Sequence, residues 1–124
     1  DQGTYTVRVT VRDPAGASSL FTFTVYSSNL APNGAITAPP TVVPGQEVSV
    51  TVSALDSGAA DMAANFRYRV TWGDGSSTPE VTGPASGVTF KKTYTTTGNY
   101  TMSVRITDKD GAANSNAASR PVGV

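Results

Sequence analysis

The sequence predicts an all-β protein, and three features of its 124 residues support this prediction. Thr and Val together supply 33 residues, whereas Leu supplies only three. Side chains branched at Cβ are stiff and fit a pleated sheet better than a helix. Apolar and polar residues alternate strictly in several segments, as they do in half-buried strands. Clusters of Gly, Pro, Asn and Asp separate these segments and mark turns.

The pattern of residues 4–26 predicts one β-hairpin. Apolar residues alternate with Thr and Arg in two segments, and the intervening Asp13-Pro14-Ala15-Gly16 is typical of a turn. Every second side chain of a strand points to the same face. One face of the hairpin is therefore expected to carry Tyr5, Val7, Val9, Val11, Phe21, Phe23 and Val25.

About seven further strands are predicted from Pro32 onward. A Pro39-Pro40 break follows the first short strand. Residues 57–65 contain good helix formers, so one helical turn at most is expected there. This number and spacing of strands are typical of an Ig-like β-sandwich. The alternating segments lie near residues 35–38, 48–54, 66–72, 88–94, 100–106 and 118–124.

The sequence contains an internal repeat. Residues 3–17 align with residues 98–112, and seven of the fifteen pairs are identical. The two segments are 95 positions apart, which is about one domain rather than the ~20 to 50 residues of a solenoid repeat. We therefore expect residues 1–28 to be the C-terminal hairpin of a preceding, truncated repeat, and residues 29–124 to be a complete domain of a longer protein.

Four motifs follow one another in this complete repeat. They are Trp72-Gly73-Asp74-Gly75, then Tyr94, then Gly98-Asn99-Tyr100-Thr101, and then Val104-Arg105-Ile106-Thr107-Asp108. In this order and spacing the sequence resembles the PKD (polycystic kidney disease) domain family, in which a Gly-Asp-Gly turn precedes a Tyr, a Gly-x-Tyr and a Val-x-Val-x-Asp strand. The opening Ala31-Pro32-Asn33 is also similar to the start of that family.

The resemblance implies an Ig-like β-sandwich that occurs in tandem in secreted and cell-surface proteins. Such modules act as spacers and in contacts with proteins or carbohydrates, and family membership does not fix the ligand. Many members carry Trp-Asp where this sequence has Val70 and Thr71. Any role that the family gives to that Asp is therefore absent here.

The composition excludes several function classes. Nine basic residues balance nine acidic ones without a cluster of either sign, so a nucleic-acid partner is not expected. No run of 18 apolar residues occurs, so membrane insertion is not expected either. With no His and no Cys, the sequence lacks the commonest general base, thiol nucleophiles and zinc ligands. We therefore expect a protein that is not an enzyme.

Polar residues in the predicted turns form one candidate metal site. Ca²⁺ binds several oxygen ligands, and turns at one end of a sandwich can bring such ligands together. The alternative is that these side chains only cap turns. Because Thr71 also replaces a carboxylate, the sequence favours no cofactor and leaves Ca²⁺ as the alternative. The candidate ligands are Asn33, Asp56, Asp74, Asp108 and Asp110.

Two surface features have a functional and a structural interpretation. Arg67 and Arg69 are expected on the outer face of a strand with Lys91 and Lys92 nearby, which would form a basic stripe for an acidic glycan or simply keep the strand soluble. Aromatic residues could stack on sugars if they were exposed. Because Trp72 is in phase with the apolar residues of its strand, and Tyr100 likewise, we expect both in the core.

These observations predict a non-catalytic structural and adhesive repeat module of an extracellular or cell-surface multidomain protein. Its expected partners are neighbouring repeats, other surface proteins or glycans. The alternative function is an accessory carbohydrate- or collagen-binding module of a secreted hydrolase. The apolar face of the first hairpin also requires a partner, most simply a second copy in a symmetric dimer or a swapped sandwich, with the chain's own complete domain as the alternative. In a longer protein that partner would be the missing strands of the preceding repeat.

Overall fold

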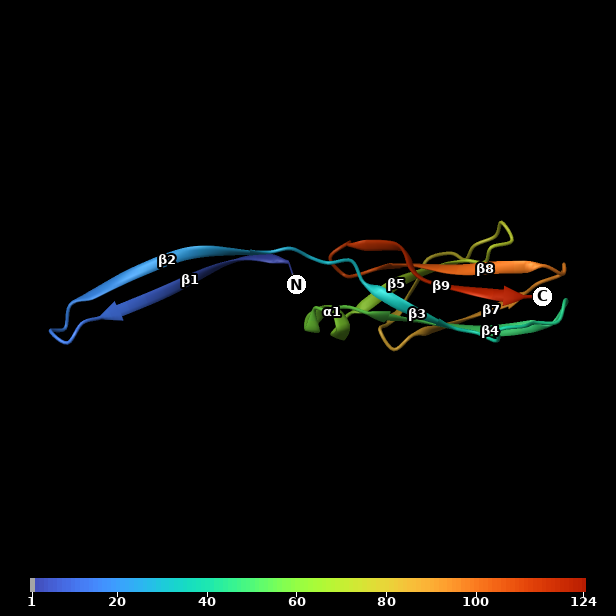
Figure 1. The fold of residues 1–124 in the computed structure, drawn as a ribbon, viewed down its shortest axis with the longest axis horizontal. Helices are drawn as coiled ribbons and strands as arrows, with labels where there is room; N and C mark the ends of the chain where they lie inside the picture. The colour runs from blue at the N-terminus through green and yellow to red at the C-terminus, as the bar shows by residue number, and fades with distance from the viewer. Residues whose placement is uncertain (1) are drawn as a thin grey trace.

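The computed structural model describes residues 2–124, which form a β-hairpin followed by a β-sandwich. The hairpin consists of β1 (Gly3–Arg12) and β2 (Ser18–Ser27), which pair antiparallel in a sheet of their own. Tyr5 lies opposite Val25, and Val9 lies opposite Phe21. The predicted hairpin and its apolar face are therefore confirmed. Figure 1 shows the hairpin extending away from the rest of the chain.

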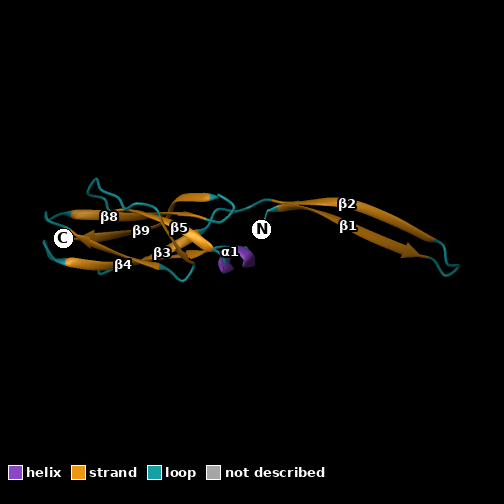
Figure 2. Cartoon of the chain, turned by 180° about the vertical axis from the view of Figure 1, so that it is seen from behind, coloured by secondary structure: helices purple, strands orange, loops and turns teal. Residues whose placement is uncertain are grey.

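The sandwich is made of two antiparallel sheets that contain seven strands, in agreement with the predicted number of about seven, although the sequence pattern locates no strand at residues 81–84. Figure 2 shows the two layers, with the short helix α1 (Ala59–Ala63) at the end nearest the hairpin. One sheet has the order β3-β4-β7, from β3 (Asn33–Thr37), β4 (Glu47–Leu55) and β7 (Val88–Thr93). The other has the order β6-β5-β8-β9, from β5 (Asn65–Thr71), β6 (Val81–Pro84), β8 (Asn99–Thr107) and β9 (Ala113–Gly123).

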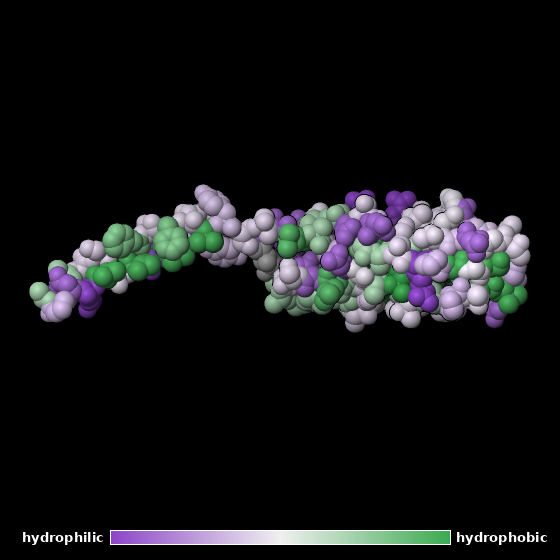
Figure 3. All heavy atoms as spheres, in the orientation of Figure 1, coloured by the Kyte–Doolittle hydropathy of each residue, from purple (hydrophilic) through white to green (hydrophobic). Residues whose placement is uncertain are grey.

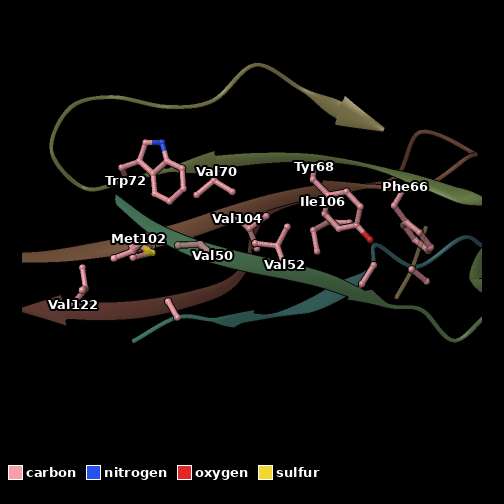
Figure 4. Packing of buried hydrophobic residues seen from close by; sticks show 14 of the residues in the cluster. Val50, Val52, Phe66, Tyr68, Val70, Trp72, Met102, Val104, Ile106 and Val122 are labelled. Atoms are coloured by element: carbon pink, nitrogen blue, oxygen red, sulfur yellow. The ribbon is translucent and has the colours of Figure 1, made fainter. Parts of the chain in front are cut away.

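The core lies between the two sheets and follows from the period-2 alternation. In β5, for example, Phe66, Tyr68 and Val70 are fully buried while the residues between them are exposed. Figure 4 shows side chains of β4, β5 and β8 meeting in one cluster. The fully buried core residues are Val50, Val52, Phe66, Tyr68, Val70, Tyr94, Met102, Val104 and Ile106.

The two aromatic residues expected in the core differ in their burial. Trp72 is 4% exposed, so its prediction is confirmed. Tyr100 is only half-buried, because it lies at the start of β8 and covers the end of the core. Its ring stacks on that of the buried Tyr94 with the centroids 4.8 Å apart. Tyr100 therefore covers the end of the core at Tyr94 as a surface lid and is not part of the core interior.

The turn after β5 explains the glycine at position 73. Gly73 has φ +85°, and a Cβ there would lie 2.6 Å from the backbone oxygen of Thr101. Only glycine fits this backbone conformation and this close approach to β8. Asp74 then accepts a hydrogen bond from the backbone N–H of Ser76 at 3.0 Å, so the Gly-Asp-Gly motif forms a tight turn.

Within residues 2–124 the helical content is confined to one short element. The helix α1 has five residues, slightly more than one turn, and lies in the segment where the sequence predicts one turn at most. Among residues 2–124 there is no helix of the length and apolarity that crossing a membrane requires.

Candidate functional site

Carboxylates gather at the end of the sandwich that faces the hairpin. Asp108 follows the last residue of β8 and is 1% exposed. Its Oδ1 accepts hydrogen bonds of 2.9 Å from the backbone N–H groups of Asp110 and Ala112. These bonds fix the β8–β9 turn and hold the carboxylate inside the protein.

The linker between the hairpin and the sandwich reaches the same carboxylate. Asn29 Nδ2 donates a hydrogen bond of 2.6 Å to Asp108 Oδ2. Asn29 follows the last residue of β2 by two positions. This bond therefore connects the base of the hairpin to the end of the sandwich that faces it.

Two further carboxylates complete the group. Asp56 follows β4, and Asp61 lies in α1 with 1% exposure. One carboxylate oxygen from each of Asp56, Asp61 and Asp108 lies within 4.8 Å of the other two. Among residues 2–124 there is no hydrogen-bond partner for Asp61 Oδ2 or for Asp56 Oδ2, although both atoms are buried. Burying carboxylate oxygens that have no partner is costly, so a compensating positive charge stabilises this group.

Lys109 supplies part of that charge. Its Nζ lies 2.7 Å from Asp110 Oδ2 and 3.2 Å from Asp61 Oδ1. The hydrogen bond to Asp110, followed by the contact with Asp61, holds the pKa of Lys109 above its usual range. One ammonium group does not balance Asp56, Asp61, Asp108 and Asp110 together.

The geometry fits a hard divalent cation. Ca²⁺ binds its oxygen ligands at about 2.3 to 2.6 Å, so ligands on opposite sides of the ion lie about 5 Å apart. Three carboxylate oxygens within 4.8 Å of one another match that spacing. A surface hollow of about 330 Å³ adjoins Asp56 and is lined also by Leu30 and Asn33. The residues that could hold the ion are therefore Asp56, Asp61 and Asp108.

The family and the fold agree with this architecture. The model of the PKD domain family matches residues 29–122. This chain belongs to the PKD domain family. A solved structure, the PKD domain of an M14-like peptidase from Thermoplasmatales archaeon SCGC AB-540-F20, has a TM-score of 0.67 at 24% identity over 78% of this chain and 98% of its own. That likeness shows the fold. No curated protein matches the sequence. PKD domains are structural and binding modules, and they are generally not catalytic.

The PKD domain brings together only part of the ligand set that the sequence predicts. Asp56 and Asp108 lie in the carboxylate group, and Asp110 lies beside it in contact with Lys109. Asn33 borders the hollow, where its Oδ1 accepts a hydrogen bond of 3.3 Å from Asn114 Nδ2. The fifth residue, Asp74, does not belong to this group.

Asp74 lies at the opposite end of the sandwich, because it comes three residues after the end of β5, whereas Asp108 follows Thr107, which pairs with a residue near the start of β5. Its Oδ2 accepts a hydrogen bond of 2.6 Å from Lys92 Nζ. The Lys92 ammonium, followed by Ser76, lowers the pKa of Asp74 to about 2. Asp74 thus has its own cation in the protein, and the five predicted ligands cannot share one ion.

Sequence reasoning missed Asp61 and Asn29. Asp61 lies among helix formers in residues 57–65, a segment whose composition indicates only secondary structure. A single acidic residue in a short apolar helix was the available signal. Asn29 carries no such signal, because its role depends on where the linker lies relative to β8.

The two other candidate surfaces are not formed. Lys91 and Lys92 lie in β7, whereas Arg67 and Arg69 lie in β5 of the other sheet, so the expected basic stripe is wrong. Lys92 instead lies over the ring of Tyr94, 5.1 Å from its centroid. The aromatic residues of the sandwich are buried apart from Phe90 and Tyr100, which are partly buried and pack against the core, so the expected sugar-stacking platform is not formed there.

Proposed function

We propose that this PKD domain is a non-catalytic structural and adhesive repeat module of a secreted or cell-surface protein, and that Ca²⁺ strengthens its junction with the preceding hairpin. The supporting observation is the group of Asp56, Asp61 and Asp108, with the linker residue Asn29 bonded to Asp108. A module of this kind acts through its length and stiffness, and both depend on the junction.

The chain's own residues explain how a cation would stiffen the junction. The turn bonds of Asp108 fix one carboxylate, and α1 fixes another at Asp61. Bound Ca²⁺ would supply the positive charge that these carboxylates need beyond that of Lys109. Asp108 belongs to the carboxylate group and also accepts the hydrogen bond from Asn29. A cation that fixes the three carboxylates would therefore also fix the linker. Extracellular Ca²⁺ modules bind at roughly 10⁻⁴ to 10⁻³ M, which suits a surface protein.

Calorimetric titration of Ca²⁺ into the chelator-treated chain tests the cation. One ion per chain is expected. Asp61→Asn should abolish binding and, in the absence of Ca²⁺, should leave the fold equally or more stable, because it removes repulsion among the carboxylates. Asp74→Asn is the matched control, since this carboxylate lies at the far end and should not affect binding. If wild type takes up no Ca²⁺, the cation proposal is wrong.

An accessory role in a secreted hydrolase is the second candidate, and the likeness to a PKD domain of an M14-like peptidase favours it. The chain would then bind the hydrolase's insoluble substrate. Retention of the whole chain on collagen and on insoluble polysaccharides distinguishes the two functions. Saturable retention at micromolar concentration supports the accessory role, whereas elution with the void volume supports a spacer whose contacts are with other surface proteins.

A further inference from the structure

The hairpin β1–β2 repeats the geometry of β8–β9. In both hairpins a Tyr near the start lies opposite a Val near the end, as Tyr5 opposite Val25 and Tyr100 opposite Val122. Two positions on, Val7 corresponds to Met102, and Val9 to Val104. The sequence repeat is therefore also a repeat of strand pairing, except that the β8–β9 ladder has a register shift between Val104 and Ile106 that the β1–β2 ladder lacks.

The turns of the two hairpins also coincide. Asp13 Oδ1 accepts hydrogen bonds from the backbone N–H groups of Ala15 and Ala17, as Asp108 Oδ1 does from Asp110 and Ala112. The glycines that follow, Gly16 and Gly111, have φ of +89° and +90°. The first hairpin is thus a folded copy of the last hairpin of a PKD sandwich.

The two copies differ in what covers them. In the sandwich, β8 is hydrogen-bonded along its outer edge to β5, and its inner face packs against β4, where Val50 and Val52 share a core with Val104. In the hairpin, β1 pairs only with β2 within residues 2–124. Figure 3 shows apolar residues following one another along it. Six of the seven residues of its apolar face are 42–58% exposed: Tyr5, Val9, Val11, Phe21, Phe23 and Val25.

We propose that β1–β2 is the last hairpin of a second PKD sandwich, and that its apolar face docks the other five strands of that sandwich, which precede it in the same polypeptide. The occupant would resemble β3–β7 of this chain: one strand bonded to the edge of β1 and a second sheet over the apolar face. This inference does not depend on the proposed adhesive role or on Ca²⁺.

The size of the face favours such a cover over a second copy of the chain. Three aromatic side chains at 51–58% exposure, together with the valines, offer on the order of 500 Å² of apolar surface. A stable dimer buries about 800 Å² on each partner. Two hairpins packed face to face would fall short and would leave both β1 edges unpaired. A repeat tethered in the same chain covers face and edge without the cost of association.

Two residues of β2 limit the size of the side chains that the docked strands can carry. Phe21 and Phe23 lie opposite Val9 and Val7, in the places where β9 carries Ala118 and Arg120 opposite Val104 and Met102. Two phenylalanine rings fill more core volume than these residues do, so the docked strands must present smaller side chains than β3, β4 and β7 do. The hairpin is therefore specific for its own repeat and does not exchange freely with β8–β9.

Amide hydrogen exchange tests the proposal in two arms. In the whole chain, β1 and β2 should exchange rapidly while β8 is protected, and sedimentation should give a monomer. In the second arm, a copy of residues 29–97 is joined directly to Gly3, so that five strands precede the hairpin in the register of the repeat. A second fusion with Phe21→Ala and Phe23→Arg restores the residues of β9 and removes the overpacking. Protection of the β1 amides should rise by about 100-fold or more in this second fusion, and by less in the first.

The results of these experiments distinguish a preceding repeat from a second copy of the chain as the partner of the hairpin. Protection in either fusion supports the preceding repeat, and protection only in the second also supports the steric role of the two rings. Rapid exchange of β1 in both fusions overturns the proposal. A dimer of the unfused chain with a protected hairpin, which Phe21→Ser dissociates and the opposite-face control Leu20→Ser does not, would overturn it in favour of a second copy.

Discussion

Asn29 and Asp108 are 79 positions apart in the sequence and are joined by a hydrogen bond of 2.6 Å from Asn29 Nδ2 to Asp108 Oδ2. The acceptor belongs to a residue that is 1% exposed, so a linker side chain is part of the buried end of the PKD sandwich. The junction is consequently an element of the fold rather than a passive connection.

Asn29→Ala should therefore lower the free energy of unfolding of the sandwich by about 1.5 kcal/mol, because a hydrogen bond to a charged acceptor is lost. Asn33→Ala is the control, since Asn33 makes a longer bond between neutral groups at 3.3 Å and is exposed. Denaturant unfolding measures both. Equal losses for the two variants would contradict a structural role for the junction contact.

The aromatic end of the core yields a second prediction. The buried Tyr94 hydroxyl donates a hydrogen bond of 2.8 Å to the backbone oxygen of Trp72, whereas the Tyr100 hydroxyl donates one of 2.9 Å to Thr96 at the surface. Tyr94→Phe should cost about 1 to 3 kcal/mol, because it leaves a buried carbonyl unpaired. Tyr100→Phe should cost less than about 1 kcal/mol, because water replaces the lost bond. A larger loss for Tyr100→Phe would show that the lid carries more of the stability than its exposure indicates.

The two glycines of the Gly-Asp-Gly turn are required for different reasons. Gly73 and Gly75 both have positive φ, but a Cβ would meet Thr101 at position 73 and open space at position 75. Gly75→Ala should cost about 1 to 2 kcal/mol from the left-handed backbone alone. Gly73→Ala should cost clearly more, because β8 must also move. Thermal melting of the two variants measures the difference, and similar melting temperatures would mean that β8 yields easily at Thr101.

The pair of Asp74 and Lys92 predicts a specific acid dependence. The hydrogen bonds from Lys92 and Ser76 lower the pKa of Asp74 from 3.8 to about 2. A carboxyl group with a lowered pKa in the folded state stabilises the fold above its unfolded pKa, and that contribution is lost as the pH falls through its folded pKa. Wild type should therefore lose stability between about pH 4 and pH 2 more steeply than Asp74→Asn, as measured by denaturant midpoints. Lys92→Met should flatten the profile in the same way, and an unchanged profile in both variants would rule out this pair as the cause.

The fold could be predicted from the sequence because its strands obey a simple period. Phe66, Tyr68 and Val70 lie in the core for the same reason that they alternate with polar residues. Periodicity fixes the face of a strand but not its position relative to the ends of the sandwich, which is why Tyr100 is half-buried. It also does not fix strand order, so Lys92 and Arg69 were placed side by side although they belong to different sheets.

The candidate metal ligands could be predicted only in part, for a related reason. Asp56 and Asp108 follow β4 and β8, and the turns at one end of a sandwich converge. Asp74 looks identical in the sequence, but β5 runs antiparallel to β8 and delivers it to the other end. Asp61 depends on the path of a short helix between sheets, which no alternation pattern encodes.

The melting temperature of the whole chain in excess Ca²⁺ and in excess chelator tests the central claim, that the carboxylates of Asp56, Asp61 and Asp108 form a cation centre at the junction. A ligand at about 100 times its Kd stabilises the folded state by about 2.7 kcal/mol. We predict a melting temperature roughly 10 to 20 °C higher in Ca²⁺ for wild type, and no difference between the two conditions for Asp61→Asn. Identical melting curves of wild type in Ca²⁺ and in chelator would contradict the account.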